Sequence, residues 1–271
     1  AQLNLCRLFE SLCPLLLFLA FLFPLGFGSL DAAVYGWFWA MIAASLVPLL
    51  LLPAGAYPPR MPGAALPGLA GFGLRDHPGA VLHLLCLRAN MLFIAVLLPP
   101  AQLGYYVVAV SIAELLCVIP ESVVLPFTSA MFRSRDADAR ELNHSVLRCY
   151  FWLMLPVCGL ALLGLWPFVR IFFGKAYLPA VACAMALVPG MFFLGLFYLL
   201  KIHFANQARP GIVSLVLALS SACCLPLGYL VTREYGIVAS AGSASLSYAV
   251  SACGLLLLYM REHKLGLKAL F

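Results

Sequence analysis

The chain has 271 residues, of which 65% are hydrophobic and only 10% are Asp, Glu, Lys or Arg. A soluble domain has about 45–50% apolar and about 25% charged residues, so this chain has too few polar groups to cover a surface in water. The formal net charge is +6, but the basic residues stand at the ends of apolar blocks, which argues against a nucleic-acid-binding surface. We therefore expect membrane lipid to surround the fold.

Apolar blocks as long as a membrane span recur along the chain. In hydrocarbon every backbone polar group must be satisfied internally, so apolar runs of about 20 residues predict helices. The first run has no small-residue cleavage site, and we interpret it as a span and not as a signal peptide. The sequence thus predicts an all-α integral membrane protein with about eight transmembrane helices, at residues 12–29, 32–52, 80–99, 104–129, 146–165, 180–200, 211–231 and 237–259.

The basic residues between these runs predict an orientation. With a cytoplasmic N-terminus, 12 of the 16 Lys and Arg residues fall in cytoplasmic segments, three fall outside and Arg88 lies within a span. Membrane proteins carry this excess of positive charge on the cytoplasmic side. An even number of helices then places both termini in the cytoplasm.

The longest hydrophilic stretches, at about 53–79 and 130–145, predict how the chain is divided. The first is rich in Gly and Pro, which is typical of a linker. We therefore expect a helix pair over residues 1–52, a cytoplasmic linker over 53–79 and a six-helix unit over 80–271.

Arg88 is the sharpest single signal of function. A charge near the middle of a span costs at least ~2.5–3.5 kcal/mol, so the side chain must face a partner or water. In a central cavity, its guanidinium would bind the phosphates of an anionic lipid. The alternative is a structural ion pair with a glutamate on the next helix.

Polar side chains form a stripe along that next helix. Glu114 and Glu121 are seven residues apart, about two turns along one face, and Ser111 and Thr128 extend the stripe. Its rise of roughly 25 Å, at 1.5 Å per residue, is close to the thickness of the hydrocarbon layer. This pattern predicts a helix that lines a route for water or substrate. The alternative is that one glutamate is buried, protonated and bonded to a neighbouring helix while the other lies near the membrane surface.

The remaining polar groups predict packing and not chemistry. His83 and Asn90 share one face of their helix, and a lone histidine near a span end is most often an ordinary polar contact. The ten cysteines show no zinc or disulfide spacing. Asp136-Ala137-Asp138 resembles a short motif of sugar-nucleotide transferases, but it lies among arginines and is expected to cap a helix. The small residues of the last span, among them Ser243 and Ser247, are expected to let helices approach closely.

Four stretches resemble a known family. They are 104–126, with Gly104-Tyr105-Tyr106, Ala113-Glu114-Leu115-Leu116 and Ile119-Pro120; 171–180, Ile171-Phe172-Phe173-Gly174-Lys175 to Ala180; Arg209-Pro210; and Tyr235-Gly236-Ile237 to Ser247-Tyr248. The first stretch resembles the eighth helix of polysaccharide and O-antigen flippases, and the second resembles the external turn before their tenth helix. The third resembles the turn before the eleventh helix, and the fourth resembles the start of the twelfth. These flippases belong to the multidrug/oligosaccharidyl-lipid/polysaccharide exporter superfamily.

The resemblance implies two six-helix lobes around a central cavity that opens to each side in turn. Residues 80–271 would form the C-terminal lobe and 1–52 the last two helices of an N-terminal lobe, with about four further helices before them. Arg88 matches a cavity arginine of the seventh helix. Where the family often has an acidic residue two positions later, this chain has Asn90, which puts an ion-pair or coupling role there in doubt. The expected cavity residues are Arg88, Glu114, Ser111, Glu121 and Asn90.

The expected function is the translocation of a lipid-linked, pyrophosphate-bearing oligosaccharide or polysaccharide precursor across a bacterial plasma (inner) membrane by alternating access. This requires no enzyme activity, cofactor, metal or nucleic acid, and H⁺ or Na⁺ is the candidate coupling ion. A multidrug or metabolite exporter is the alternative within transport, although Arg88 favours an anionic head group. A membrane-embedded polymerase or acyltransferase would need a sizeable polar loop or a His/Asp cluster at the membrane surface, and we expect neither. A membrane partner that does not itself transport also stays open.

Overall fold

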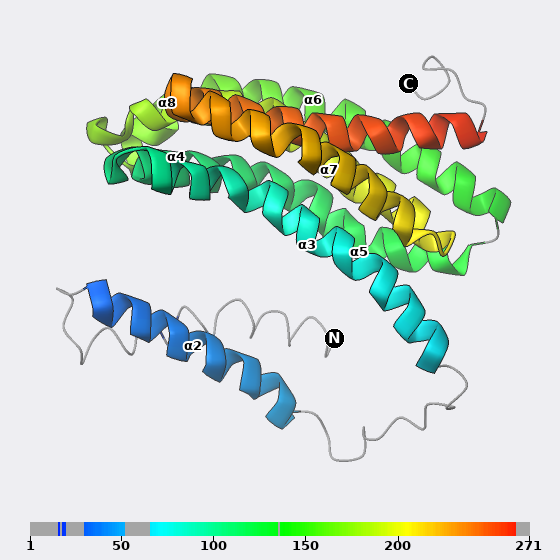
Figure 1. Ribbon diagram of the computed structural model, residues 1–271. Helices are drawn as coiled ribbons and strands as arrows, with labels where there is room; N and C mark the ends of the chain where they lie inside the picture. Colours follow the sequence, from blue (N-terminus) through cyan, green and yellow to red (C-terminus); the bar gives the residue numbers. More distant parts are fainter. Residues whose placement is uncertain (1–15, 17, 20–29, 52–65, 135, 264–271) are drawn as a thin grey trace. The chain divides into compact units, whose positions relative to one another are not determined.

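The computed structural model describes residues 16, 18, 19, 30–51, 66–134 and 136–263. Apart from short turns these residues are helical, and none of them belongs to a β-strand (Figure 1). This confirms the predicted all-α membrane fold. The first predicted span, 12–29, and the first part of the predicted linker, 53–65, lie almost wholly outside the described residues.

The chain divides into two compact units, Ala1–Leu66 and Pro67–Phe271. In the first unit, α2 (Leu30–Leu51) corresponds to the predicted span 32–52. Its aromatic residues Trp37, Phe38 and Trp39 are exposed. Exposed apolar side chains at this density are expected of a helix whose solvent is lipid.

The second unit contains the long helices. They are α3 (Leu66–Leu97), α4 (Pro100–Glu114), the 3₁₀ turn η2 (Leu115–Cys117), α5 (Val118–Arg133), α6 (Asp136–Phe172), the 3₁₀ turn η3 (Lys175–Tyr177), α7 (Pro179–Asn206) and α8 (Pro210–His263). Among the described residues, five continuous helical stretches are long and apolar enough to cross a membrane. One of them joins α4, η2 and α5 into a single crossing, Pro100–Arg133.

α8 is two helices that meet at a bend. Its 54 residues would extend about 80 Å as one straight helix, more than twice the hydrocarbon thickness of about 30 Å. Gly236 interrupts the helix with φ 78° and ψ −160°, a conformation open to glycine because it has no Cβ. The two halves correspond to the predicted spans 211–231 and 237–259, so the described part of this unit has six apolar crossings.

The start of α3 differs from the prediction. Residues 66–79 are helical, although their Gly and Pro content indicated a linker. Pro67 stands in the first turn of the helix, where a missing backbone N–H leaves no hydrogen bond unmade, and Pro78 is accommodated farther along. The part of the predicted linker from residue 66 to 79 is therefore helical, while the proposed role of 53–79 as a connection between lobes stays a prediction.

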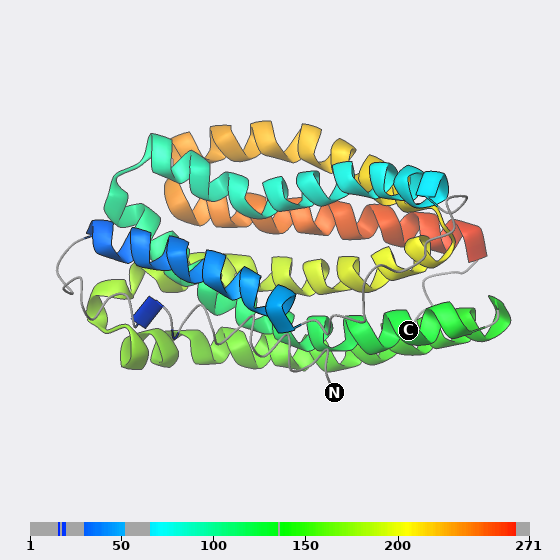
Figure 2. The same cartoon turned by 90° about the horizontal axis from the view of Figure 1, so that it is seen from below.

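α7 is the core of the second unit. It packs against α4, α5, α6 and α8, and both views show its ribbon among the other helices of this unit (Figures 1 and 2). Most of its side chains are buried, whereas α6 exposes large apolar residues such as Trp152 and Leu163. The pattern is that of a helix bundle with protein at its centre and lipid around it.

Small residues let α7 approach the second half of α8. A Cβ placed on Gly190 would lie 2.5 Å from Ser245 Oγ and 2.7 Å from Ser245 Cα. The Ser245 hydroxyl donates a hydrogen bond to the Ala186 carbonyl oxygen, at 2.5 Å. Ser243 and Ser247 are buried too, which confirms the predicted small-residue packing face.

We expect Gly190→Ala to destabilise the protein by about 1–3 kcal/mol, because an added methyl group in a close-packed contact must displace backbone. The measurement is thermal unfolding of the purified protein in detergent. Gly159→Ala on α6 is the control, since a Cβ there meets nothing within 4 Å and alanine favours helix. Equal melting temperatures for the two variants would contradict the close approach of α7 and α8.

Candidate functional site

Arg88 and Glu114 form an ion pair between neighbouring helices. Arg88 Nη1 on α3 lies 3.2 Å from Glu114 Oε1 at the end of α4, and the side chains are 47% and 39% exposed. The structural ion pair considered from the sequence is therefore present, but it lies on the surface of the unit. Pairs exposed to water contribute only about 0.2–1 kcal/mol, so this contact does little to hold the bundle together.

A pocket of about 390 Å³ lies between α5 and α7, and its mainly apolar lining carries a few polar side chains. Glu121 and Thr128 from α5 line it together with Tyr198 and Lys201 from α7. Tyr198 and Lys201 are three residues apart and so lie on one face of their helix.

His83 brings α3 to the same surface. Its ring stacks on Phe197, with centroids 5.3 Å apart, and meets Tyr198 edge-on at 5.6 Å. The name polar face is given to six polar residues of three crossings, α3, α4–α5 and α7: His83, Arg88, Glu114, Glu121, Tyr198 and Lys201. Arg88 pairs with Glu114, and Glu121, Tyr198 and Lys201 line the pocket.

The crossing that carries both glutamates is not a uniform α-helix. Glu114 ends α4, the 3₁₀ turn Leu115–Cys117 follows, and α5 contains the buried Pro120 near its start. The ideal two-turn relation assumed from the spacing therefore does not apply. Glu114 pairs with Arg88 on α3, whereas Glu121 lines the pocket together with Tyr198 on α7.

Three predicted stripe or cavity residues lie in different surroundings. Ser111 is exposed on α4, three residues before Glu114 and hence on a neighbouring part of its face. Thr128 lines the pocket, and its hydroxyl donates to the Val124 carbonyl oxygen at 2.6 Å. Asn90 is only 6% exposed, and its Oδ1 accepts a hydrogen bond from Ser243 Oγ on α8 at 3.4 Å. The structure thus places Asn90 inside the bundle and away from the polar face.

The sequence interpretation missed Lys201 and Tyr198. Lys201 was counted in a cytoplasmic loop, because the apolar run was taken to end at residue 200. α7 continues to Asn206, so the lysine stands within the helix. The three-residue spacing of a tyrosine and a lysine on an otherwise apolar helix was the signal that could have identified them.

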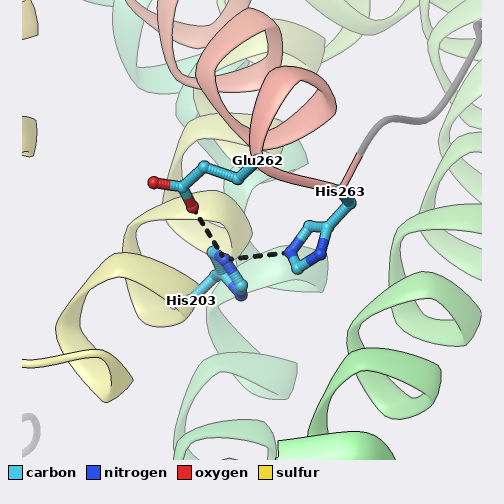
Figure 3. Close-up of side chains that lie close together, drawn as sticks. All are labelled: His203, Glu262 and His263. Atoms are coloured by element: carbon cyan, nitrogen blue, oxygen red, sulfur yellow. Dashed lines mark hydrogen bonds and ion pairs between the residues drawn. The ribbon is translucent and has the colours of Figure 1, made fainter.

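A second polar cluster lies where α7 and α8 end. His203, Glu262 and His263 form the one group of His, Cys and acidic side chains in the described chain that is close enough to hold a metal ion (Figure 3). The sequence interpretation did not identify this cluster. A pocket of about 770 Å³ adjoins it, lined by Arg140, Glu141, His144, Ser145, Arg148, Cys149, Trp152, Tyr259 and His263. No residue of that pocket belongs to the polar face.

A family model described as polysaccharide biosynthesis protein matches residues 13–182, more than half of the chain. The match includes Arg88, Glu114 and Glu121 and ends just inside α7. Comparison with curated proteins and with solved structures gave no significant match.

We expect Glu121→Cys to react with a membrane-impermeant thiol reagent applied to both sides of membrane vesicles, because its pocket would be filled with water. Leu163→Cys on α6 is the matched control. Leu163 is 79% exposed, but its neighbours are apolar and its surroundings would be lipid. Both variants are compared in a background in which the exposed Cys149, Cys223 and Cys253 are replaced by serine. Labelling of position 163 but not of position 121 would contradict a wet polar face.

Proposed function

Because the chain belongs to the family of polysaccharide biosynthesis proteins, we propose that it moves a lipid-linked oligosaccharide or polysaccharide precursor across the membrane. It is a multi-pass membrane protein, with several helices that are long and apolar enough to cross a bilayer. A glycan is rich in hydroxyl groups and cannot cross hydrocarbon without losing its hydrogen bonds to water. The observation that carries the proposal is the polar face, which offers such a molecule a hydrophilic surface.

The cost of exposing charge to lipid supports a wet environment for this face. Arg88, Glu114, Glu121 and Lys201 carry four formal charges within helical stretches that are long and apolar enough to cross a membrane. A single charge at the centre of a membrane helix costs at least ~2.5–3.5 kcal/mol. A route filled with water or with a polar substrate would remove this cost, whereas contact with acyl chains would not.

The chemistry of the face fits a phosphate-linked sugar. The planar guanidinium of Arg88 can donate two parallel hydrogen bonds to a phosphate, and Lys201 adds a second positive charge. The Glu121 carboxylate can accept hydrogen bonds from sugar hydroxyls, and the Tyr198 hydroxyl can donate or accept them. Arg88 favours an anionic head group over the cationic drugs that an exporter of the same superfamily would carry.

Arg88 can exchange its partner Glu114 for a phosphate group of the substrate. Glu114 Oε1 lies 3.2 Å from the guanidinium and offsets its charge. A solvated pair of this kind is worth only about 0.2–1 kcal/mol, so an incoming phosphate displaces the carboxylate at small cost. Glu114 then becomes available to bind H⁺ or Na⁺, the proposed coupling ions.

Transport in this scheme requires no covalent step. The substrate binds in one facing state and leaves in the other, and the direction follows from different affinities of the two states or from an ion gradient. We place the protein in a bacterial plasma membrane with both termini in the cytoplasm, as the distribution of basic residues predicts. The pocket between α5 and α7 then opens toward the cytoplasmic half of the membrane, where a newly made precursor would enter.

We expect Arg88→Ala to lower affinity for the lipid-linked substrate by about 10–100-fold, since hydrogen bonds to charged groups contribute about 1.5–3 kcal/mol. The measurement is the amount of surface polysaccharide in cells that depend on the full-length protein for its export. Arg233→Ala is the matched control, because Arg233 pairs with Glu234 at 3.7 Å outside the polar face. Normal export in Arg88→Ala cells would end the proposal.

Exchanging the charges of Arg88 and Glu114 distinguishes a role of the pair in substrate binding from a role in stability. If Arg88 binds the phosphate, the double variant Arg88→Glu/Glu114→Arg should retain the melting temperature of the wild type but export poorly, because the guanidinium has moved to another helix. The single variant Arg88→Glu should fail to export while melting only slightly below the wild type, because the exposed pair contributes little to stability. Full recovery of export in the double variant would show that the pair is structural only.

A further inference from the structure

Three side chains that bind metals converge at the ends of α7 and α8. His203 Nε2 lies 3.4 Å from His263 Nε2 and 3.8 Å from Glu262 Oε2. The three ligand atoms all lie within 4.8 Å of one another. Figure 3 shows both imidazole rings and the carboxylate pointing toward one another. We propose that they form a binding site for a divalent transition-metal ion, with Zn²⁺ as the best fit.

The separations agree with the geometry of such an ion. Zn²⁺ binds imidazole nitrogen at about 2.0–2.1 Å in tetrahedral sites, which places neighbouring ligand atoms about 3.3 Å apart. The two histidine nitrogens already have this separation, at 3.4 Å. The carboxylate oxygen is slightly farther away, and a rotation of the Glu262 side chain would close the difference. No movement of either helix is required.

The surroundings hold the imidazoles in place. The His203 side chain is 5% exposed, and its ring meets Tyr259 edge-on with centroids 4.8 Å apart. Tyr259 also packs on His263, with centroids 4.6 Å apart. This buried tyrosine therefore limits the rotation of both histidines, and ligands that are already oriented lose less conformational entropy when they bind an ion.

The backbone also favours a cation at this place. α7 ends at Asn206, so the carboxyl end of a long helix lies beside His203. A helix end of this kind carries a partial negative charge of about half an elementary charge. It lowers the energy of a positive ion bound there.

Some nearby groups favour binding of the ion and others oppose it. Arg209 Nη1 donates to Glu262 Oε1, which fixes the carboxylate and leaves Oε2 directed at the histidines, as an outer partner of a metal ligand does. Its positive charge and that of Arg140, which lies near His263, weaken binding. Gln207 Nε2 lies 3.1 Å from His203 Nε2, so the exposed amide must turn away before an ion enters.

The ligand set defines the class of ion. Two imidazoles and one carboxylate suit Zn²⁺ and other late transition metals and do not suit Mg²⁺ or Ca²⁺, which prefer oxygen ligands. Three protein ligands leave one tetrahedral position for water. The ion would fasten the end of α7 to the end of α8, and the inference is independent of what the polar face transports.

The test is titration of the purified full-length protein with Zn²⁺ and Co²⁺ in detergent, using an affinity tag without histidine. We expect one ion per chain, with Co²⁺ giving the visible absorption of a tetrahedral complex. His203→Asn and His263→Asn should each weaken binding by at least about 10–100-fold, a loss known even for outer partners of metal ligands. His77→Asn, an exposed histidine of α3, should bind like the wild type.

Thermal unfolding provides a second measurement. Zn²⁺ should raise the melting temperature of the wild type, because an ion that binds only the folded state stabilises it. His203→Asn and His263→Asn should melt like the wild type in a chelator and gain nothing from Zn²⁺. The site is rejected if the wild type binds no more Zn²⁺ than the double variant His203→Asn/His263→Asn. It is also rejected if His77→Asn loses as much binding as the single-ligand variants.

Discussion

The high cost of charge in hydrocarbon is the constraint on which the arrangement of this protein depends. Most of the chain meets this constraint by having few charged residues. In the second unit, apolar side chains fill the core and also cover the outer surface. The exception is the Arg88–Glu114 pair, which lies at the surface of the bundle with both side chains well exposed. A pair in that position is stable in a membrane only if its surroundings are polar, and this requirement connects the fold to the proposed transport route.

α7 contributes side chains both to the core and to the polar face. Toward α4, α6 and α8 it presents small and apolar residues such as Gly190 and Leu187, which close the core. Toward the polar face it presents Tyr198 and Lys201. The groups proposed to contact substrate therefore stand on the most buried helix of the unit. A rigid element positions such groups more precisely than a loop does, while partner exchange at Arg88 needs only side-chain movement.

The fold could be predicted because apolar runs of membrane length have few alternatives. The Arg88–Glu114 pairing was one of two options that the charges left open. The place of Asn90 could have been predicted better, since a residue two positions from Arg88 points to another side of the helix. The His203, Glu262 and His263 cluster had no local signal, because about sixty residues separate its members and only the packing of α7 on α8 brings them together. The early start of α3 was hidden by prolines that a first helical turn tolerates.

The most direct test of the account is the environment of Ser111, which is exposed one turn from Glu114. A nitroxide spin label attached to a cysteine at this position, in the full-length protein reconstituted in a bilayer, reports collisions with oxygen from the lipid phase and with a nickel chelate from the aqueous phase. The account predicts that the nickel chelate relaxes the label more strongly than oxygen does. Relaxation dominated by oxygen would mean that this side of the bundle faces acyl chains, and the proposed polar route would then not exist.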